Sequence, residues 1–169
     1  MPEAKTWTVR VALVDDAEAI ATIHVDSWRA IYRGLMPDKL LARLSIPKRC
    51  EGRRRIIAKG RACLVLERGG IVIGFADYGP SEESGEGEIY AMYLNPSRWR
   101  QGGGKLLYTA ALEGLRAEGF STLEIGVLEG NRIARSFYEK QGLELVANSR
   151  KMIRFSDADL PHLLYRGKI

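Results

Sequence analysis

The stretch from Glu88 to Leu112 reads EIYAMYLNPSRWRQGGGKLLYTAAL and carries the strongest structural signal in the chain. Its first part, Glu88–Leu94, is rich in Ile, Tyr, Met and Leu without a breaker, which favours a buried strand. Pro96 ends this strand because proline has no N–H for a ladder and restricts the residue before it. Three glycines, 102–104, then precede apolar residues at helical spacing. The predicted order is strand, glycine loop, helix.

The glycine loop, Gly102–Gly104, has a physical use at the start of a helix. The first amides of a helix have no internal partner, and the helix dipole adds partial positive charge there. Glycines let the backbone approach a bulky anion, and Arg98, Arg100 and Lys105 surround the loop with positive charge. The pattern therefore predicts a phosphate cradle. A connection without a ligand is the alternative, but three consecutive glycines would then lower stability for no return.

Two familiar phosphate-binding patterns do not match this loop. A P-loop, G-x-x-x-x-G-K-S/T, needs glycine at position 99 and a hydroxyl residue after Lys105, where the chain has Trp99 and Leu106. The dinucleotide pattern G-x-G-x-x-G needs glycine at position 107, which is Leu107. Both interpretations are excluded.

The loop instead resembles the acetyl-CoA signature of the GNAT superfamily of N-acetyltransferases, Q/R-x-x-G-x-G/A. Gly102 and Gly104 supply the two small positions, while Trp99 replaces the first Gln or Arg. A second segment, NRIARSFYEKQG, resembles the superfamily pattern N-x-x-A-x-x-F-Y-x-x-x-G. It matches at Asn131, Ala134, Phe137, Tyr138 and Gly142. The resemblance covers nearly the whole chain. It implies a mixed α/β (α+β) GNAT-like fold, with six or seven mostly antiparallel strands, a splayed parallel pair at the centre and flanking helices.

The rest of the chain fits one domain, residues 1–169. Helices are predicted at 17–32, 36–44, 45–59, from the glycine loop to 118, and at 133–141. Strands are predicted at 7–13, 62–67, 71–78, 88–94 and 121–128, with a polar loop at 79–87. For the C-terminus we expect a hairpin of 143–147 with 152–155, and an edge strand at 163–165.

Length and composition bound the class of protein. The 169 residues are 46% hydrophobic and 28% charged, an ordinary profile for a soluble domain with a proper core. No apolar run approaches membrane-spanning length, and the first residues lack the apolar region of a signal peptide. Two cysteines and two distant histidines provide no disulfide framework and no zinc spacing. We therefore expect a cytoplasmic protein with no metal and no membrane partner.

The net charge of +5 is concentrated in residues 48–61, which hold seven basic side chains and one acidic one. Such a cluster can attract an anionic ligand or nucleic acid. The simpler interpretation is the solvated face of a helix. No aromatic residue is interleaved with these charges, which argues against a platform for single-stranded nucleic acid.

The resemblance implies an acetyl-CoA-dependent N-acetyltransferase, an acyltransferase of the EC 2.3.1 type, with direct transfer to a primary amine in a ternary complex. It implies that the Met92 amide polarises the thioester carbonyl. It also implies that Asn131 holds the pantetheine arm, although Asn131 also suits a helix N-cap. The implied acetyl-CoA-binding residues are Met92, Tyr93, Leu94, Arg100, Gln101, Gly102, Gly103, Gly104, Lys105, Asn131 and Tyr138.

Two residues are candidates for proton transfer. Tyr138 fits the acid that meets the leaving thiolate, because a thiol has a pKa of about 8.5 and a phenol about 10. Its alternative role is helix core. Glu88 lies where the resemblance implies a catalytic glutamate, and it can act through water if burial raises its pKa. Its alternative is a solvated carboxylate beside Glu86.

The acceptor side is the least specified. His24, Trp28 and Tyr32 share one helix face, and the resemblance implies that the first helices line the acceptor channel. That face can receive an amine by cation–π contact, or simply pack. The acidic loop at 82–86 can attract a cationic acceptor, or be solvated.

Candidate acceptors are a protein N-terminus or lysine, a polyamine, an aminoglycoside or a small amine metabolite. Two other classes stay open at this point: a module that binds acyl-CoA without turnover, and a basic nucleic-acid binder. A homodimer is common in such families.

Overall fold

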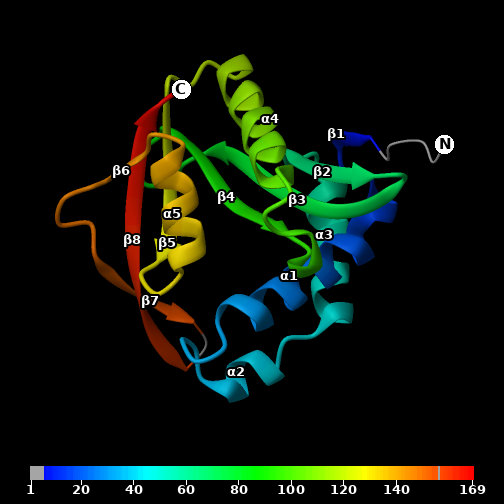
Figure 1. Cartoon of the computed structure of the whole chain (residues 1–169), viewed down its shortest axis with the longest axis horizontal. Helices are drawn as coiled ribbons and strands as arrows, with labels where there is room; N and C mark the ends of the chain where they lie inside the picture. The colour runs from blue at the N-terminus through cyan, green and yellow to red at the C-terminus, as the bar shows by residue number, and fades with distance from the viewer. Residues whose placement is uncertain (1–5, 156) are drawn as a thin grey trace.

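The structure is a computed structural model that describes residues 6–155 and 157–169. A single mixed sheet runs through the molecule, with helices on both faces (Figure 1). The strands are β1 (Trp7–Val11), β2 (Cys63–Arg68), β3 (Ile71–Pro80), β4 (Gly87–Leu94), β5 (Thr122–Leu128), β6 (Glu144–Leu145), β7 (Lys151–Phe155) and β8 (Ala158–Lys168). The helices are α1 (Ala17–Ile31), α2 (Asp38–Ala42), α3 (Ile46–Ala58), α4 (Gly103–Ala117) and α5 (Arg132–Lys140), with short 3-10 turns η1 (Val14–Asp16) and η2 (Pro96–Arg98).

The sheet order is β1-β2-β3-β4-β5-β8-β6, and β7 also pairs with β8. Every pairing in this sheet is antiparallel except that of β4 with β5. The mostly antiparallel sheet with one central parallel pair is therefore confirmed, with eight strands in place of six or seven. The two-residue β6 lies within the predicted strand at 143–147 but is shorter than it.

The parallel pair separates almost as soon as it forms. Only Gly87 with Leu123 and Glu88 with Glu124 are in register, and β4 then diverges from β5. A bulge lies just beyond this point, because Tyr78 pairs with Ile89 whereas Asp77 pairs with Ala91. A bulge bends the strand that carries it. The V-shaped gap between β4 and β5 in Figure 1 is the result.

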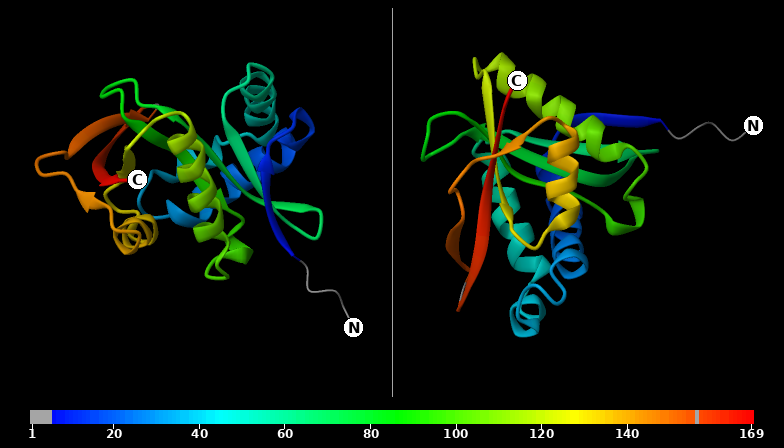
Figure 2. Two further views of the ribbon diagram at one scale, coloured as in Figure 1. Left: turned by 90° about the horizontal axis from the view of Figure 1, so that it is seen from above. Right: turned by 60° about the vertical axis from the view of Figure 1, so that its left-hand side comes forward.

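Helices cover both faces of the sheet (Figure 2), and each face has its own cluster of buried hydrophobic residues. On one face α4 and α5 pack through fully buried residues such as Leu107, Ala111 and Leu115, which recur at helical spacing. On the other face α1 packs on β2 and β3 through Ile20 and Ile23, and α3 packs against α1. The gap between β4 and β5 therefore connects the two faces.

The predicted helices and the first five strands are present at nearly the predicted bounds. The start of α3 shows the expected cap, because the Ser45 hydroxyl accepts a hydrogen bond from the Lys48 amide and Pro47 follows in the first turn.

The predicted C-terminal arrangement is wrong. Residues 143–147 and 152–155 do not pair with each other, because β6 and β7 both pair with β8. Nor is 163–165 a short edge strand, since β8 has 11 residues and lies between β5 and these two strands. Pro161 and Gly167 lie within β8, and these residue types weaken a strand signal in sequence.

Candidate active site

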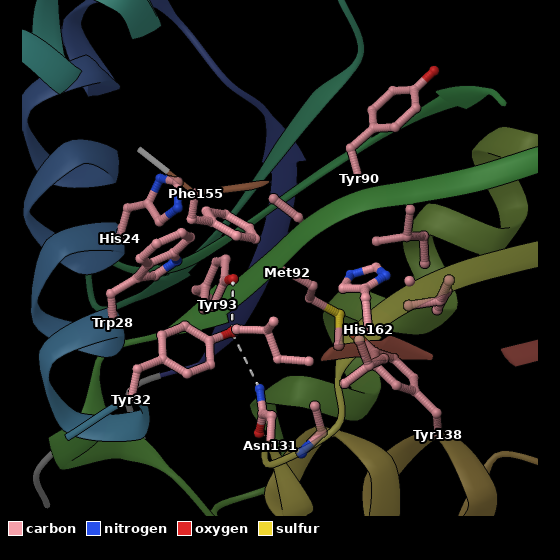
Figure 3. Close-up of a pocket in the computed structure, with 17 residues that line it drawn as sticks. His24, Trp28, Tyr32, Tyr90, Met92, Tyr93, Asn131, Tyr138, Phe155 and His162 are labelled. Carbon is pink, nitrogen blue, oxygen red and sulfur yellow. Dashed lines mark hydrogen bonds between the residues drawn. The ribbon is translucent and has the colours of Figure 1, made fainter. Parts of the chain in front are cut away.

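A cavity of about 270 Å³ occupies the gap between β4 and β5 (Figure 3). Side chains reach it from both faces of the sheet: from α1 and β7 on one side and from α5 on the other. The lining residues that carry polar atoms or aromatic rings are His24, Trp28, Tyr32, Tyr90, Tyr93, Asn131, Tyr138, Phe155 and His162. The cavity thus brings the predicted acceptor residues of α1 together with Met92, Tyr93, Asn131 and Tyr138.

The glycine loop begins α4 with free backbone donors. Gly102 is the N-cap residue with φ of 89°, a left-handed conformation that favours glycine, and no side chain caps the helix. A Cβ added at Gly102 would meet nothing within 4 Å, so the backbone is open on this side. An uncapped helix start with an open approach suits an anionic group. The loop therefore fits the phosphates of a coenzyme A ligand.

The three glycines have different reasons to be glycine. A Cβ at Gly103 would lie 2.3 Å from the Trp7 ring and 2.8 Å from the Leu66 side chain. At Gly104 the nearest atom would be 3.5 Å away on Phe137, an ordinary contact. Gly102 is thus needed for its backbone conformation and Gly103 for packing against Trp7.

Trp99, which replaces the Gln or Arg of the resembled signature, anchors the loop. Its indole N–H donates to the Leu94 carbonyl over 2.9 Å. The Ser27 hydroxyl of α1 donates to the same oxygen, also over 2.9 Å, and Ser27 is fully buried. The end of β4 is therefore fixed to α1 and to the glycine loop through one carbonyl.

The backbone of Met92 faces the gap. The Asn95 amide donates to the Ile73 carbonyl of β3 over 2.8 Å, so the amides of residues 91, 93 and 95 point toward β3. The N–H and C=O groups of the intervening Met92 and Leu94 must then point away from β3, toward the side of β5. Since β5 has diverged at this level, the Met92 N–H points into the cavity.

Tyr138 enters the cavity from α5. Its side chain is 5% exposed, and burial raises the pKa of its hydroxyl above the usual 10. The neighbouring Tyr93 and Tyr108 raise this pKa further. The hydroxyl is thus protonated at neutral pH and available as a donor.

Asn131 serves as a helix cap and a cavity residue together. Its Oδ1 accepts a hydrogen bond from the Ala134 amide over 3.1 Å, which caps α5. Its Nδ2 donates to the Tyr32 hydroxyl over 3.4 Å. The buried Asn131 therefore connects α5 with α1 across the cavity (Figure 3).

Glu88 lies at the last paired position of β4 and β5, one residue before the lining begins. Burial raises the pKa of this half-buried carboxyl, and the negative charges of Glu124, Glu83 and Glu82 add to the rise. A hydrogen bond with Ser81 works in the opposite direction. Glu88 is thus close to the cavity but not part of its wall.

On α1, His24 and Trp28 form one side of the cavity. The His24 ring stacks on Tyr93 with centroids 5.0 Å apart, and its Nδ1 lies 3.3 Å from Nη1 of Arg49. Burial, with the charges of Arg49 and Arg53, lowers the pKa of His24 to about 2. His24 is consequently neutral at physiological pH. The cation over the Trp28 ring, 5.1 Å from its centroid, is Arg49 of α3.

Seven predicted ligand residues lie outside the cavity lining: the three glycines of the loop described above, and Arg100, Gln101, Lys105 and Leu94. Arg100 and Lys105 are exposed on the glycine loop, where Arg100 has a left-handed φ of 61°. The exposed Gln101 accepts a hydrogen bond from Arg68 over 2.9 Å. Leu94 packs against the core on the α4 face.

Sequence reasoning missed His162 of β8, which lines the cavity. A Cβ at Gly126 would lie 2.2 Å from the His162 ring, so this glycine makes room for the imidazole. A glycine inside a predicted strand is a signal for such a close approach, although it does not name the partner. Burial and the charge of Lys151 lower the pKa of His162, and Glu83 opposes them.

Two kinds of site are not found. Among residues 6–155 and 157–169, no group of three or more His, Cys, Asp or Glu side chains could hold a metal ion. None of the helices in those ranges combines the length and apolar composition needed to cross a membrane.

Comparisons with known proteins define the class of protein. The sequence model of the acetyltransferase (GNAT) family matches residues 17–143. Among solved structures, the PaiA N-acetyltransferase from Thermoplasma acidophilum in complex with coenzyme A has a TM-score of 0.72 and 19% identity, covering 97% of this chain and 99% of its own. The yncA protein from Salmonella typhimurium with its cofactor acetyl-CoA has a TM-score of 0.70 and 18% identity, covering 96% and 93%.

The chain belongs to the acetyltransferase (GNAT) family. A relative from Bacillus subtilis (strain 168), the uncharacterized N-acetyltransferase YuaI, is 38% identical over 143 residues, which is 83% of this chain and 82% of that protein. The predicted family is therefore confirmed, and acetyl transfer is the general activity that it supports.

Proposed function

We propose that this chain is an acetyl-CoA-dependent N-acetyltransferase of the EC 2.3.1 type, which transfers acetyl directly to a primary amine in a ternary complex. One observation carries the proposal. The cavity between β4 and β5 joins the Met92 N–H, the Tyr138 hydroxyl and the α1 side chains in one space. The similarity to proteins named N-acetyltransferases, and to neighbours that hold coenzyme A or acetyl-CoA, supports it.

The chain's own residues hold the co-substrate at its pyrophosphate and along its pantetheine arm. The amides of Gly103, Gly104 and Lys105 at the start of α4 receive the pyrophosphate, with Arg100 and Lys105 adding positive charge. Asn131 hydrogen-bonds the pantetheine arm at the end of β5. Acetyl-CoA, when bound, supplies an activated thioester.

The reacting centre lies between β4 and α5. The Met92 N–H donates to the thioester carbonyl oxygen and stabilises the negative charge that develops there as the amine attacks. Tyr138 donates its proton, or a hydrogen bond, to the departing thiolate. Its raised pKa keeps the hydroxyl protonated until that moment.

Direct transfer fits the composition of the cavity. No Ser or Cys is among its lining residues, so the described part of the wall offers no such nucleophile for an acyl-enzyme. Both cysteines are buried elsewhere, Cys50 between α1 and α3 and Cys63 in β2. Burial also raises the pKa of the Cys63 thiol, which keeps it unreactive.

Glu88 acts as the general base through water. Its raised pKa makes it a better proton acceptor than a solvated carboxylate, and it lies next to the cavity. His162 is the competing candidate, because it lines the cavity and its lowered pKa leaves it neutral at pH 7.

Calorimetric titration of acetyl-CoA into wild type and Gly102→Glu tests the function. A carboxylate at the helix start should weaken binding at least about 100-fold, because it repels the pyrophosphate and occupies its place. Gly119→Glu is the matched control. Gly119 ends the same helix with φ of 93° and open space around its added Cβ, so the backbone strain is similar. Its affinity for acetyl-CoA should be unchanged.

The outcomes separate the alternatives. Binding together with release of free thiol in an amine screen supports the transferase. Binding without thiol release for any amine or peptide would support a module that binds acyl-CoA without turnover. Absence of binding at millimolar acetyl-CoA, with salt-dependent DNA binding instead, would indicate a nucleic-acid protein.

The pH dependence of kcat/KM identifies the base. If Glu88 is the base, its protonation causes the fall of kcat/KM at low pH. Glu88→Gln should then remove this acidic limb of the profile, and His162→Gln should leave it in place. If His162→Gln removes the limb and Glu88→Gln does not, the assignment passes to His162.

A further inference from the structure

Arg49 of α3 lies beside the cavity without an acidic partner. It is half-buried, its guanidinium carbon is 5.1 Å from the Trp28 ring centroid, and its Nη1 is 3.3 Å from His24 Nδ1. Among the described residues, no salt bridge joins Arg49 to an Asp or Glu. One turn later, Arg53 is paired with Asp77 over 2.5 Å. No carboxylate in the described part of the chain therefore neutralises the positive charge of Arg49.

Arg49 and its two aromatic neighbours, His24 and Trp28, carry N–H groups that can donate hydrogen bonds to a ligand. A guanidinium can only donate hydrogen bonds, so His24 Nδ1 must accept from Arg49 and the proton of this neutral imidazole lies on Nε2. The Nε1–H of Trp28 is buried beside the Tyr93 hydroxyl, which is a weak acceptor for it, and makes no hydrogen bond of ordinary geometry to a described residue. Arg49, His24 and Trp28, called here the α1–α3 wall, thus present an unpaired positive charge and two N–H groups. His24 and Trp28 line the cavity, whereas Arg49 contacts both of them without being a lining residue itself.

We propose that the α1–α3 wall binds a carboxylate of the acceptor, so that the substrate is a primary amine that also carries a carboxylate. This inference rests on the proposed function. A half-buried arginine gains most from a charged acceptor, because charge-assisted hydrogen bonds are about twice as strong as neutral ones. A carboxylate also accepts from the buried Trp28 N–H, for which the Tyr93 hydroxyl is a weaker, neutral acceptor.

The charge pattern around the cavity orients such a substrate. Glu124 pairs with Arg166 and Glu83 with Lys151, which leaves Glu82 and Glu88 as carboxylates of the β4–β5 junction without an ion pair to a described residue, and the nearby acidic charges raise the pKa of Glu88. The α1–α3 wall carries positive charge from Arg49. A zwitterionic acceptor therefore places its ammonium group toward Glu88 and its carboxylate toward Arg49. A polyamine or an aminoglycoside would instead bring a second cation to Arg49.

Arg49 differs from its neighbours in the basic cluster at 48–61. Arg54 and Arg55 are exposed, and Arg55 pairs with Glu51 over 3.2 Å. Arg53 is buried against Phe75 and paired with Asp77. Arg49 is thus the member of the cluster that combines an unpaired charge with contact to two lining residues.

The experiment compares matched acceptors. Each amino acid, from glycine and alanine to 4-aminobutyrate and 6-aminohexanoate, is paired with the amine that lacks the carboxylate, such as propylamine for 4-aminobutyrate. Thiol release gives kcat/KM for both members on wild type, Arg49→Gln and Arg54→Gln. Arg54→Gln removes the same charge from an exposed site on the same helix.

Wild type should prefer the carboxylate-bearing member of its best pair at least about ten-fold, the range expected for one hydrogen-bonded charge. Arg49→Gln should abolish this preference by raising KM for the amino acid at least about ten-fold more than KM for the plain amine. Arg54→Gln should retain the preference. Arg49→Lys keeps the charge but loses the planar fork, and should retain part of it. Thermal melting of each variant confirms folding.

Equal rates for both members of every pair on wild type would overturn the proposal, as would an equal loss on both members in Arg49→Gln. If no pair turns over, calorimetric titration of 4-aminobutyrate into the protein with saturating coenzyme A decides: binding by wild type and not by Arg49→Gln supports the carboxylate site, and absence of binding by wild type overturns it. Transfer to plain amines without preference leaves the transferase intact, whereas failure of acetyl-CoA to bind overturns the proposed function itself.

Discussion

The glycine loop and the α1–α3 wall border the same β4–β5 gap but are built from different parts of the chain. The glycine loop presents backbone N–H groups, and its side chains, such as Trp99, serve to fix its position. The α1–α3 wall presents side chains that are held by one another, with Arg49 over Trp28 and against His24. One region depends on the course of the backbone, and the other on three particular side chains.

This difference explains how each region tolerates change. A backbone cradle keeps its amides when a neighbouring side chain is exchanged, so the chain can carry Trp99 where the resembled signature has Gln or Arg. A wall of interlocked side chains loses its pattern of donors when any one of them changes. The loop therefore suits a ligand common to a family, and the wall suits one that differs between members.

The largest expected effect is on stability, and it concerns the ion pair of Arg53 with Asp77, one helical turn from Arg49 of the α1–α3 wall. Arg53→Met should lower the free energy of unfolding by about 3–5 kcal/mol, because it leaves the Asp77 carboxylate buried without its partner. Urea unfolding at pH 7.5 measures this, with the exposed Arg54→Met as control. A loss below about 1 kcal/mol would show that this side of the molecule adjusts to the change.

The next effect concerns catalysis between the two regions. Tyr138→Phe should lower kcat about 100-fold, or about 2.7 kcal/mol, with little change in KM, because it removes the proton donor and keeps the ring. The stability of the variant should stay close to that of wild type, since no hydrogen bond of the Tyr138 hydroxyl to another described residue is present. A kcat within three-fold of wild type would assign Tyr138 to packing alone.

A third test asks which glycine the loop needs for packing. Gly103→Ala should cost about 1–3 kcal/mol of stability, because its Cβ would overlap the Trp7 ring. Gly104→Ala, with its nearest contact at 3.5 Å, should cost less than about 0.5 kcal/mol. Adding Trp7→Leu should recover part of the Gly103→Ala loss in thermal unfolding. Equal effects of the two alanines would contradict this assignment.

The smallest effect is a pH dependence that originates in the α1–α3 wall. The pKa of His24 is about 2 in the folded chain and about 6.5 when unfolded, so below pH 6.5 the unfolded chain binds more protons and stability falls as pH falls. Between pH 7 and pH 6 this amounts to about 0.7 kcal/mol. The difference between wild type and His24→Phe in urea unfolding isolates it. Parallel pH curves for the two proteins would show that His24 titrates normally.

Sequence reasoning was most successful where the signal is local. The strand, glycine loop and helix follow one another directly, and Asn131 and Tyr138 belong to one short motif, so their places could be predicted. The positions of Arg49 and His162 could not, because packing of α3 on α1 brings Arg49 against two lining residues and pairing of β8 with β5 brings His162 to the cavity. For the same reason the role of Gly103 was hidden, since Trp7 is 96 positions earlier in the chain.

The carbonyl oxygen of Leu94 joins the two regions. It accepts from Ser27 on the helix that carries His24 and Trp28, and from Trp99 at the start of the glycine loop. A displacement of α1 on binding of an acceptor would therefore act on the loop through one shared atom. If the acceptor changes the affinity for a ligand on the loop by some factor, that ligand changes the affinity for the acceptor by the same factor. The binding of either ligand then depends on the presence of the other.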